Sequence, residues 1–261
     1  RALELCRELG DVYGMVINMV NLGQVATQNG DWEQALGWFK QAYLLVEAND
    51  EKYSMALVLS DWGTTLLKAD RFAEARDILT QALHLSEEAE AEMILMNIHE
   101  SLGELDYTEG KTQDAEAHYA EALRLAREAD ADGTIISLLF RLAVQRAKPG
   151  QRAETAPILL ESLRMARRFP LVFKRLEMLL NAAEYFARLG ESALSERCCH
   201  LVTNHPLMVK EWQPIVRRIS ERLALLGHEA RSLTPSTSSS DADVSAILDE
   251  IEVWLVNNPP I

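Results

Sequence analysis

Cysteine, glycine, proline and long apolar runs are all scarce in this 261-residue chain, and each scarcity excludes a class of protein. Three cysteines are too few for a disulfide framework, and none has the C-x-x-C spacing that is typical of zinc ligands. Only 12 glycines and 8 prolines exclude a collagen-like or low-complexity chain. No apolar run reaches the ~18 residues that cross a bilayer, and no secretion signal begins the chain. We therefore expect a cytoplasmic protein.

Basic residues are also few, with 26 Lys and Arg against 40 Asp and Glu, and the net charge is −14. This balance excludes general attraction to nucleic acids or anionic membranes, so neither is expected as a partner. The charge is uneven, because residues 1–135 carry a net charge of −16, residues 136–235 carry +7 and residues 236–261 carry −5. The basic middle segment is therefore expected to attract the acidic tail.

Catalytic signatures are absent from the sequence. It has no phosphate-binding loop, no dinucleotide-binding glycine motif, no nucleophile elbow and no H-E-x-x-H motif. Cys198, Cys199 and His200 are the one group of adjacent ligand-type residues. Adjacent helical side chains diverge by about 100°, so we interpret the two thiols as small apolar residues in a helix. We expect no enzyme activity, no cofactor and no metal.

What the sequence does contain is a repeat of 40 residues that continues for five units without insertion or deletion. Each unit has two small positions, a larger one, a third mostly small position and a turn residue. The first small position is Gly23, Gly63, Gly103, Ala143 and Ala183, and the second is Ala35, Ala75, Ala115, Thr155 and Ser195. The larger position is Phe39, Leu79, Tyr119, Leu159 and Cys199, the third is Ala42, Ala82, Ala122, Ser162 and Val202, and the turn is Gly30, Asp70, Gly110, Gly150 and Gly190.

This pattern predicts a helical hairpin in each unit, because small residues spaced along one face let two helix backbones approach closely. One hairpin cannot bury its apolar face alone, so successive hairpins must stack. The expected first helices, called A, span 11–28, 51–68, 91–108, 133–148 and 171–188. The expected second helices, called B, span 32–48, 72–88, 112–129, 152–168 and 192–204.

The order of Leu22-Gly23, Ala35, Phe39 and Ala42 resembles the tetratricopeptide repeat. The resemblance covers residues 11–205 and implies an all-α, right-handed superhelical solenoid that binds a protein or peptide without catalysis. The period of 40 departs from the family's 34. An aromatic residue expected three positions after the Gly-like position is present only as Phe186. The longer repeats are similar to the sensor arrays of STAND-type and LuxR-like ATPase regulators of bacteria.

The expected organisation has five parts. Residues 1–10 are the end of a preceding B helix, residues 11–205 are the five repeats, and 206–229 hold a terminal helix. Residues 230–240 form a Ser/Thr-rich linker, and 241–261 form an amphipathic helix and tail. The register at residues 1–10 predicts that the parent chain extends upstream.

The candidate ligand-binding wall consists of A-helix residues that the hairpin cores do not use. From the family's pattern these are Ile17, Val20, Gln24, Leu57, Ser60, Thr64, Leu67, Asn97, Glu100, Glu104, Tyr107, Ser137, Phe140 and Val144. The alternative interpretation of each is ordinary packing between repeats. An alternative function is a small-molecule sensor whose ligand lies near Phe140, Tyr107 and Glu104.

The tail carries a second candidate docking element. One helical stripe contains Val244, Ile247, Leu248, Ile251, Trp254 and Leu255, and acidic residues line the other side. The stripe must be buried against something. We favour a cap on the open end of the repeats, in place of a missing B helix, over a helix bound in a groove of its own chain or of a second protomer. A basic cluster from Arg164 to Arg175 is interpreted either as a dock for an acidic partner or as a solvated turn.

Overall fold

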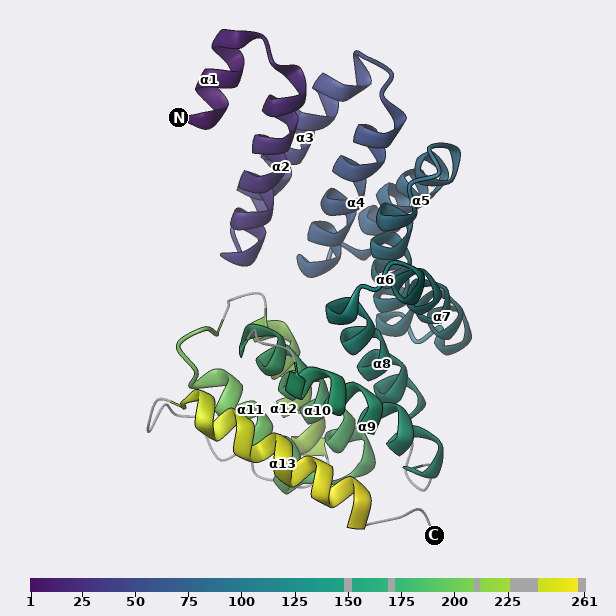
Figure 1. Ribbon diagram of the computed structural model, residues 1–261, viewed down its shortest axis with the longest axis vertical. Coiled ribbons are helices and arrows are strands. Elements are labelled where there is room, and N and C mark those ends of the chain that lie inside the picture. The colour runs from purple at the N-terminus through teal and green to yellow at the C-terminus, as the bar shows by residue number, and fades with distance from the viewer. Residues whose placement is uncertain (148–151, 169–171, 209–211, 226–238, 258–261) are drawn as a thin grey trace. The chain divides into compact units, whose positions relative to one another are not determined.

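The computed structural model describes residues 1–147, 152–168, 172–208, 212–225 and 239–257 (Figure 1). Within these ranges every regular element is a helix, and none is a strand. The helices are α1 (Ala2–Leu9), α2 (Val12–Gln28), α3 (Trp32–Glu47), α4 (Lys52–Lys68), α5 (Phe72–Glu88), α6 (Glu92–Thr108), α7 (Thr112–Glu128), α8 (Asp132–Arg146), α9 (Arg152–Arg168), α10 (Val172–Leu189), α11 (Ser192–Thr203), α12 (Gln213–Leu225) and α13 (Asp241–Asn257). The expected fold class, an all-α helical-repeat solenoid, is confirmed.

The chain folds into two compact units, Arg1–Leu125 and Ala126–Ile261. In the first unit, α2 pairs with α3 and α4 with α5, while α1 packs on α2. In the second unit, α8 pairs with α9 and α10 with α11. Among the described residues, no helix combines the length and the apolar character that a membrane span requires.

Close approach of paired helices explains the small residues of the repeat. A Cβ atom added at the Gly-like position of α2, α4 or α6 would lie 2.6 or 2.7 Å from the large side chain of the following B helix. The pairs are Gly23 with Phe39, Gly63 with Leu79 and Gly103 with Tyr119. Each large side chain is essentially buried, so the pair forms the centre of its hairpin. Any larger residue at the glycine would force the helices apart.

Left-handed residues end both kinds of helix at intervals of 40. After the A helices they are Gly30, Asp70, Gly110 and Gly190, and after the B helices they are Gly10, Asp50, Glu90 and Asp130. Gly150 lies outside the described residues. The second series escaped the sequence analysis, because three of its four members are acidic rather than glycine. In both series the residues close the helix with backbone bonds such as Asp31 N to Ala26 O and Ala91 N to Ser86 O.

The end of the chain differs from expectation in its boundaries. The terminal helix expected within 206–229 is α12, which begins at Gln213, because Pro214 suits the first turn of a helix while the residues around Pro206 form a turn. Helix α12 packs on α10 as the next A helix would. Arg218 of α12 donates to Glu184 of α10 at 2.9 Å. Most of the expected linker, 230–238, lies outside the described residues.

Candidate functional site

Three A helices of the first unit lie side by side. Helix α2 contacts α4, and α4 contacts α6. We call their jointly exposed side the A-helix face. Side chains at equivalent repeat positions recur across it, because each helix repeats the orientation of the one before. Ile17 and Leu57 are half-buried on this face, and Asn97 at the third equivalent position is exposed.

A ladder of side-chain hydrogen bonds holds these helices in register. Each rung joins one A helix to the next, with partners 37 or 38 residues apart. The rungs are Gln24 Nε2 to Asp61 Oδ2 at 3.0 Å, Thr27 Oγ1 with Thr65 Oγ1 at 2.9 Å, and Thr64 Oγ1 with Ser101 Oγ at 2.8 Å. The repeat therefore fixes the A-helix face by polar contacts as well as by packing.

Asp61 supplies the carboxyl of the ladder, and its pKa is raised. Burial raises its pKa to about 6, against smaller opposing effects of the Gln24 hydrogen bond and of Lys68. A carboxyl with this pKa changes charge near neutral pH. Asp61 could not be singled out from the sequence, because nothing in the repeat pattern distinguishes it from an ordinary surface aspartate.

The structure divides the predicted wall residues into two groups. Eight are exposed or half-buried: Ile17, Gln24, Leu57, Thr64, Asn97, Glu100, Glu104 and Tyr107. Six are buried and serve packing: Val20, Ser60, Leu67, Ser137, Phe140 and Val144. The eight residues of the first group all lie on α2, α4 and α6. The alternative of inter-repeat packing therefore describes the second group.

The predicted wall residues of α8 are occupied within the second unit. Ser137 accepts from Lys174 Nζ at 2.6 Å and donates to Glu177 Oε1 at 3.0 Å, so its hydroxyl links α8 to α10. Phe140 is fully buried. It therefore presents no surface to a small molecule, so the lumen site suggested from the sequence has no support at this residue.

A polar cluster joins α5, α6 and α7. Asp106 is nearly fully buried and accepts from Arg76 Nη2 at 2.7 Å, while His118 Nε2 lies 3.6 Å from its other oxygen. His118 Nδ1 also shares a hydrogen bond of 2.9 Å with His99 Nδ1. Burial is the main cause that lowers the pKa of both imidazoles. No group of three metal-ligating side chains suited to an ion occurs among the described residues.

The acidic tail helix α13 docks on the second unit. It contacts α9, α10 and α11, so it lies along the groove between two successive B helices, over the A helix between them (Figure 1). The predicted stripe faces inward, because Val244, Ile247, Leu248, Ile251 and Leu255 are buried. Trp254 stands edge-on to Phe186, with ring centroids 5.1 Å apart. The favoured prediction, a cap in place of a missing B helix, is thus wrong, because α13 packs on α9, α10 and α11. The alternative, a groove of its own chain, describes its position.

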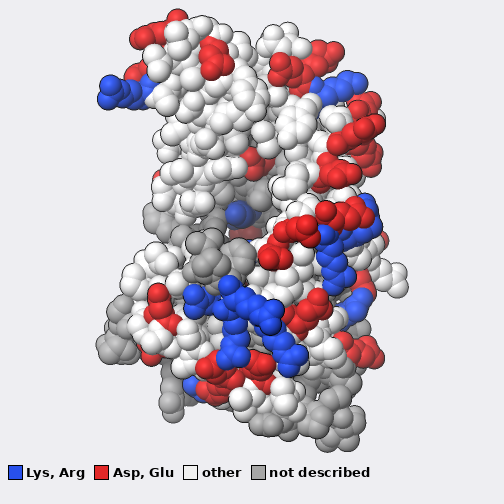
Figure 2. Space-filling view, viewed as in Figure 1, with Lys and Arg blue, Asp and Glu red and all other residues white. Residues whose placement is uncertain are grey.

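Charge complementarity aligns α13 in its groove. Arg164 and Arg167 of α9 pair with Glu252, Arg167 also pairs with Asp249, and Arg197 of α11 pairs with Glu250. Figure 2 shows basic side chains gathered beside acidic ones in this region. Arg164 and Arg167 of the basic cluster therefore hold an acidic helix of the same chain, whereas Lys174 of that cluster pairs with Glu177 within α10.

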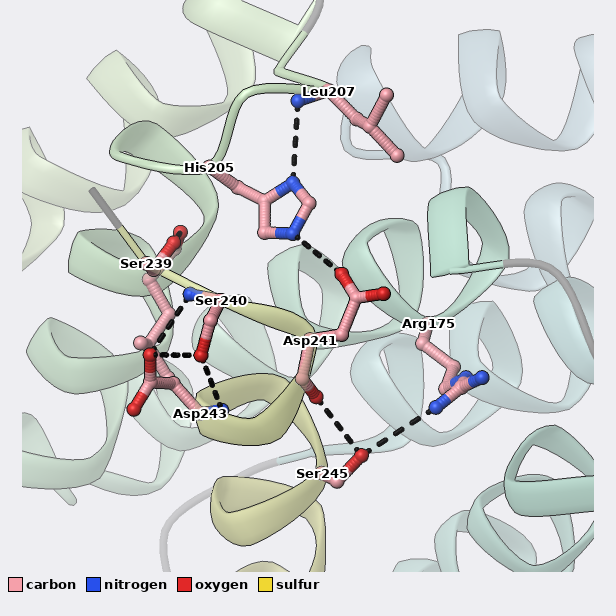
Figure 3. Close-up of polar contacts among 9 residues, drawn as sticks. Arg175, His205, Leu207, Ser239, Ser240, Asp241, Asp243 and Ser245 are labelled. Carbon is pink, nitrogen blue, oxygen red and sulfur yellow. Dashed lines mark hydrogen bonds and ion pairs between the residues drawn. The ribbon is translucent and has the colours of Figure 1, made fainter.

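The first turn of α13 is anchored separately (Figure 3). The amide of Leu207 donates to His205 Nδ1 at 3.2 Å, so Nε2 of this ring carries the proton and donates to Asp241 Oδ1 at 3.1 Å. Ser240 and Asp243 form a capping box, in which Asp243 accepts from the Ser240 amide at 2.8 Å. Ser239 donates to Leu201 O at 2.6 Å.

The adjacent cysteines lie in the core of this docked assembly. Cys198 and Cys199 are buried and free, like Cys6, which is half-buried. Burial raises the pKa of Cys199 to about 12 and that of Cys198 still further above its usual range. Such thiols remain protonated and pack as apolar groups.

Comparison with known proteins agrees with this geometry. The tetratricopeptide repeat family matches residues 14–88 and 54–128. A crystal structure of BtubC (BKLC) from P. vanneervenii shares the fold, with a TM-score of 0.61 and 18% identity, over 92% of this chain and 93% of that chain. No curated protein matches the sequence. The family is generally a non-catalytic interaction scaffold. The chain is therefore an all-α, tetratricopeptide-like helical-repeat solenoid.

Proposed function

We propose that the chain is a scaffold that binds a protein or peptide on the A-helix face of its first unit. The observation that carries the proposal is the set of three A helices held in register by the polar ladder. Their side chains on this face include apolar, amide and acidic groups, such as the half-buried Leu57 and Glu104 and the exposed Asn97. This mixture suits an extended or helical peptide with apolar anchors and basic or amide groups.

A finer form of the proposal places the array as the cytoplasmic sensor arm of a larger STAND-type regulator. It rests on the resemblance of the 40-residue repeats alone. Ligand binding would bias the parent protein between two states through its different affinity for each. A phosphate-binding loop encoded upstream in the same gene would support this placement, and a continuous gene without one would contradict it.

A peptide library displayed against the full chain tests the binding proposal. Sequences selected by the wild-type chain should bind at least tenfold more weakly to Asn97→Lys, because the new charge stands at an exposed position of the A-helix face. Gln113→Lys, an exposed position on α7, provides the matched control and should bind normally. Failure to select any sequence, or equal loss in both variants, would contradict the proposal.

A further inference from the structure

The groove that holds α13 recurs in the first unit. Moving back three repeats, or 120 residues, converts α9, α10 and α11 into α3, α4 and α5. A cavity of about 580 Å³ lies between these three helices, and its apolar lining includes Leu36, Trp62, Leu66 and Ile78. We call it the first-unit groove. Leu66 stands at the position of Phe186, which contacts Trp254 of α13.

Side-chain exposure distinguishes the two grooves. In the second unit, where α13 covers the groove, Ala182, Phe186 and Cys198 are all fully buried. At the equivalent positions of the first unit, Trp62 and Ile78 retain exposed surface, although Leu66 beneath them is buried. A Cβ added at Gly37 on the rim would meet no atom within 4 Å. The first-unit groove is thus open enough to admit apolar side chains.

The charges around the groove are reversed between the units. Arg167 and Arg197, which pair with acidic residues of α13, correspond to Glu47 and Asp77. Arg164 corresponds to Leu44, an exposed apolar residue. An acidic helix such as α13 would therefore meet repulsion at the first-unit groove, and a basic helix would meet attraction.

The remaining charges of the first-unit groove leave this preference in place. Arg71 is held by Glu74 at 2.6 Å and by Glu33 at 3.5 Å, so its charge is already paired. Lys40 also lines the groove and is exposed, so it offsets part of the acidic charge of Asp77 and Glu47. The first unit as a whole carries 23 Asp and Glu against 9 Lys and Arg.

The next groove along the first unit differs. Between α5 and α7, Asp106 replaces the apolar floor residue and joins Arg76 to His118. This charged cluster bridges the three helices at the repeat position that is equivalent to Phe186, the residue that contacts Trp254 in the second unit. An apolar anchor is therefore excluded there, which favours the groove over α4 of these two.

We propose that the first-unit groove binds a basic amphipathic helix of a partner protein, in the way that the second unit binds its own α13. The apolar side of the helix would fill the cavity over Leu66, and Lys or Arg side chains would pair with Glu47 and Asp77. This site is distinct from the A-helix face and goes beyond the function proposed for that face.

The test uses two labelled peptides and the full chain. One peptide is residues 240–257, and the other carries Asp249→Lys, Glu250→Lys and Glu252→Lys. Fluorescence anisotropy should show that the lysine peptide binds at least tenfold more tightly than the native one. Its affinity should fall with added salt, because the recognising charges are exposed.

Matched variants locate the binding. Gly37→Phe should fill the groove and weaken the lysine peptide at least tenfold, whereas Gly37→Ala should leave it unchanged. Glu47→Arg combined with Asp77→Arg should reverse the preference toward the native peptide. Asn97→Lys should have no effect, so a failure here is distinguishable from a failure of the A-helix face.

Three results would overturn the proposal. Absence of binding by the lysine peptide would remove the site. Equal or tighter binding of the native peptide would assign the groove to α13 of a second copy. Binding that is insensitive to Gly37→Phe would place the peptide elsewhere on the chain.

Discussion

A single repeat position determines what each groove between B helices can do. Phe186 provides an aromatic floor for Trp254, Leu66 provides an aliphatic floor beside an open cavity, and Asp106 closes its groove with a charged cluster. From the sequence, Phe186 stood out as the one aromatic residue at this position, and Leu66 and Asp106 are departures from the pattern. Their roles depend on Trp254, Arg76 and His118, which the repeat itself does not specify. At the residue scale, the side chain at this repeat position changes the character of each groove, while the helical backbone around it stays the same.

Asp61 gives a residue-scale prediction with a pH dependence. Its folded-state pKa of about 6 lies above the ordinary value of 3.8, so the folded state binds more protons between these values. The free energy of unfolding therefore falls as pH rises from about 4 to about 6, because Asp61 must then be ionised while it is buried. Asp61→Asn keeps an acceptor for Gln24 and should raise the free energy of unfolding by about 1–2 kcal/mol at pH 8. At pH 4 it should have little effect. Equal stabilisation in urea titrations at both pH values would contradict this account.

At the scale of elements, the helices and their turns were predictable because two signals coincide in the sequence. Small residues set the helix contacts, and Gly or Asp marks the end of each A helix, so the ten repeat helices begin and end within a few residues of expectation. The start of α12 could be placed only within the range 206–229, in which Pro214 favours the start of a helical run. The groove against which α13 packs remained the less favoured of two alternatives, because the choice depends on contacts between segments far apart in the sequence.

Glu90 provides an element-scale prediction. It ends α5 at a φ of 50°, where a side chain is strained, and it is exposed. Glu90→Gly removes a strain of about 1–2 kcal/mol at an entropic cost of about 0.5–1 kcal/mol, so we expect a net stabilisation near 0.5–1 kcal/mol. The matched control, Gly110→Ala at a φ of 79°, should destabilise by a similar amount. Thermal denaturation followed by circular dichroism measures both, and a destabilising Glu90→Gly would refute the strain argument.

The docking of α13 is tested by a charge swap. Arg197→Glu should weaken the contact of α13 with α11, and adding Glu250→Arg should restore it. Both side chains are about half exposed, so the coupling energy should be about 0.5–1 kcal/mol. A double-mutant cycle in urea gives this energy. A coupling of zero would indicate that apolar burial alone holds α13.

At the scale of the whole molecule, the net charge belongs to the first unit. Residues 1–125 carry a net charge of −14, whereas residues 126–261 hold 17 basic and 17 acidic residues. The acidic residues of the second unit include those of α13, which pair with the arginines of its groove and offset their charge. On the face shown in Figure 2, acidic side chains predominate over the first unit. A basic partner would therefore be drawn to the first unit, with an association rate that falls with ionic strength.

The central claim is that equivalent grooves between B helices hold amphipathic helices of opposite charge. Hydrogen–deuterium exchange of the full chain, with and without the lysine peptide of residues 240–257, tests this claim most directly. We predict slower exchange in α3, α4 and α5 on peptide binding, with exchange in α13 unchanged. Faster exchange in α13 together with new protection of α9 and α11, or no change anywhere, would contradict it.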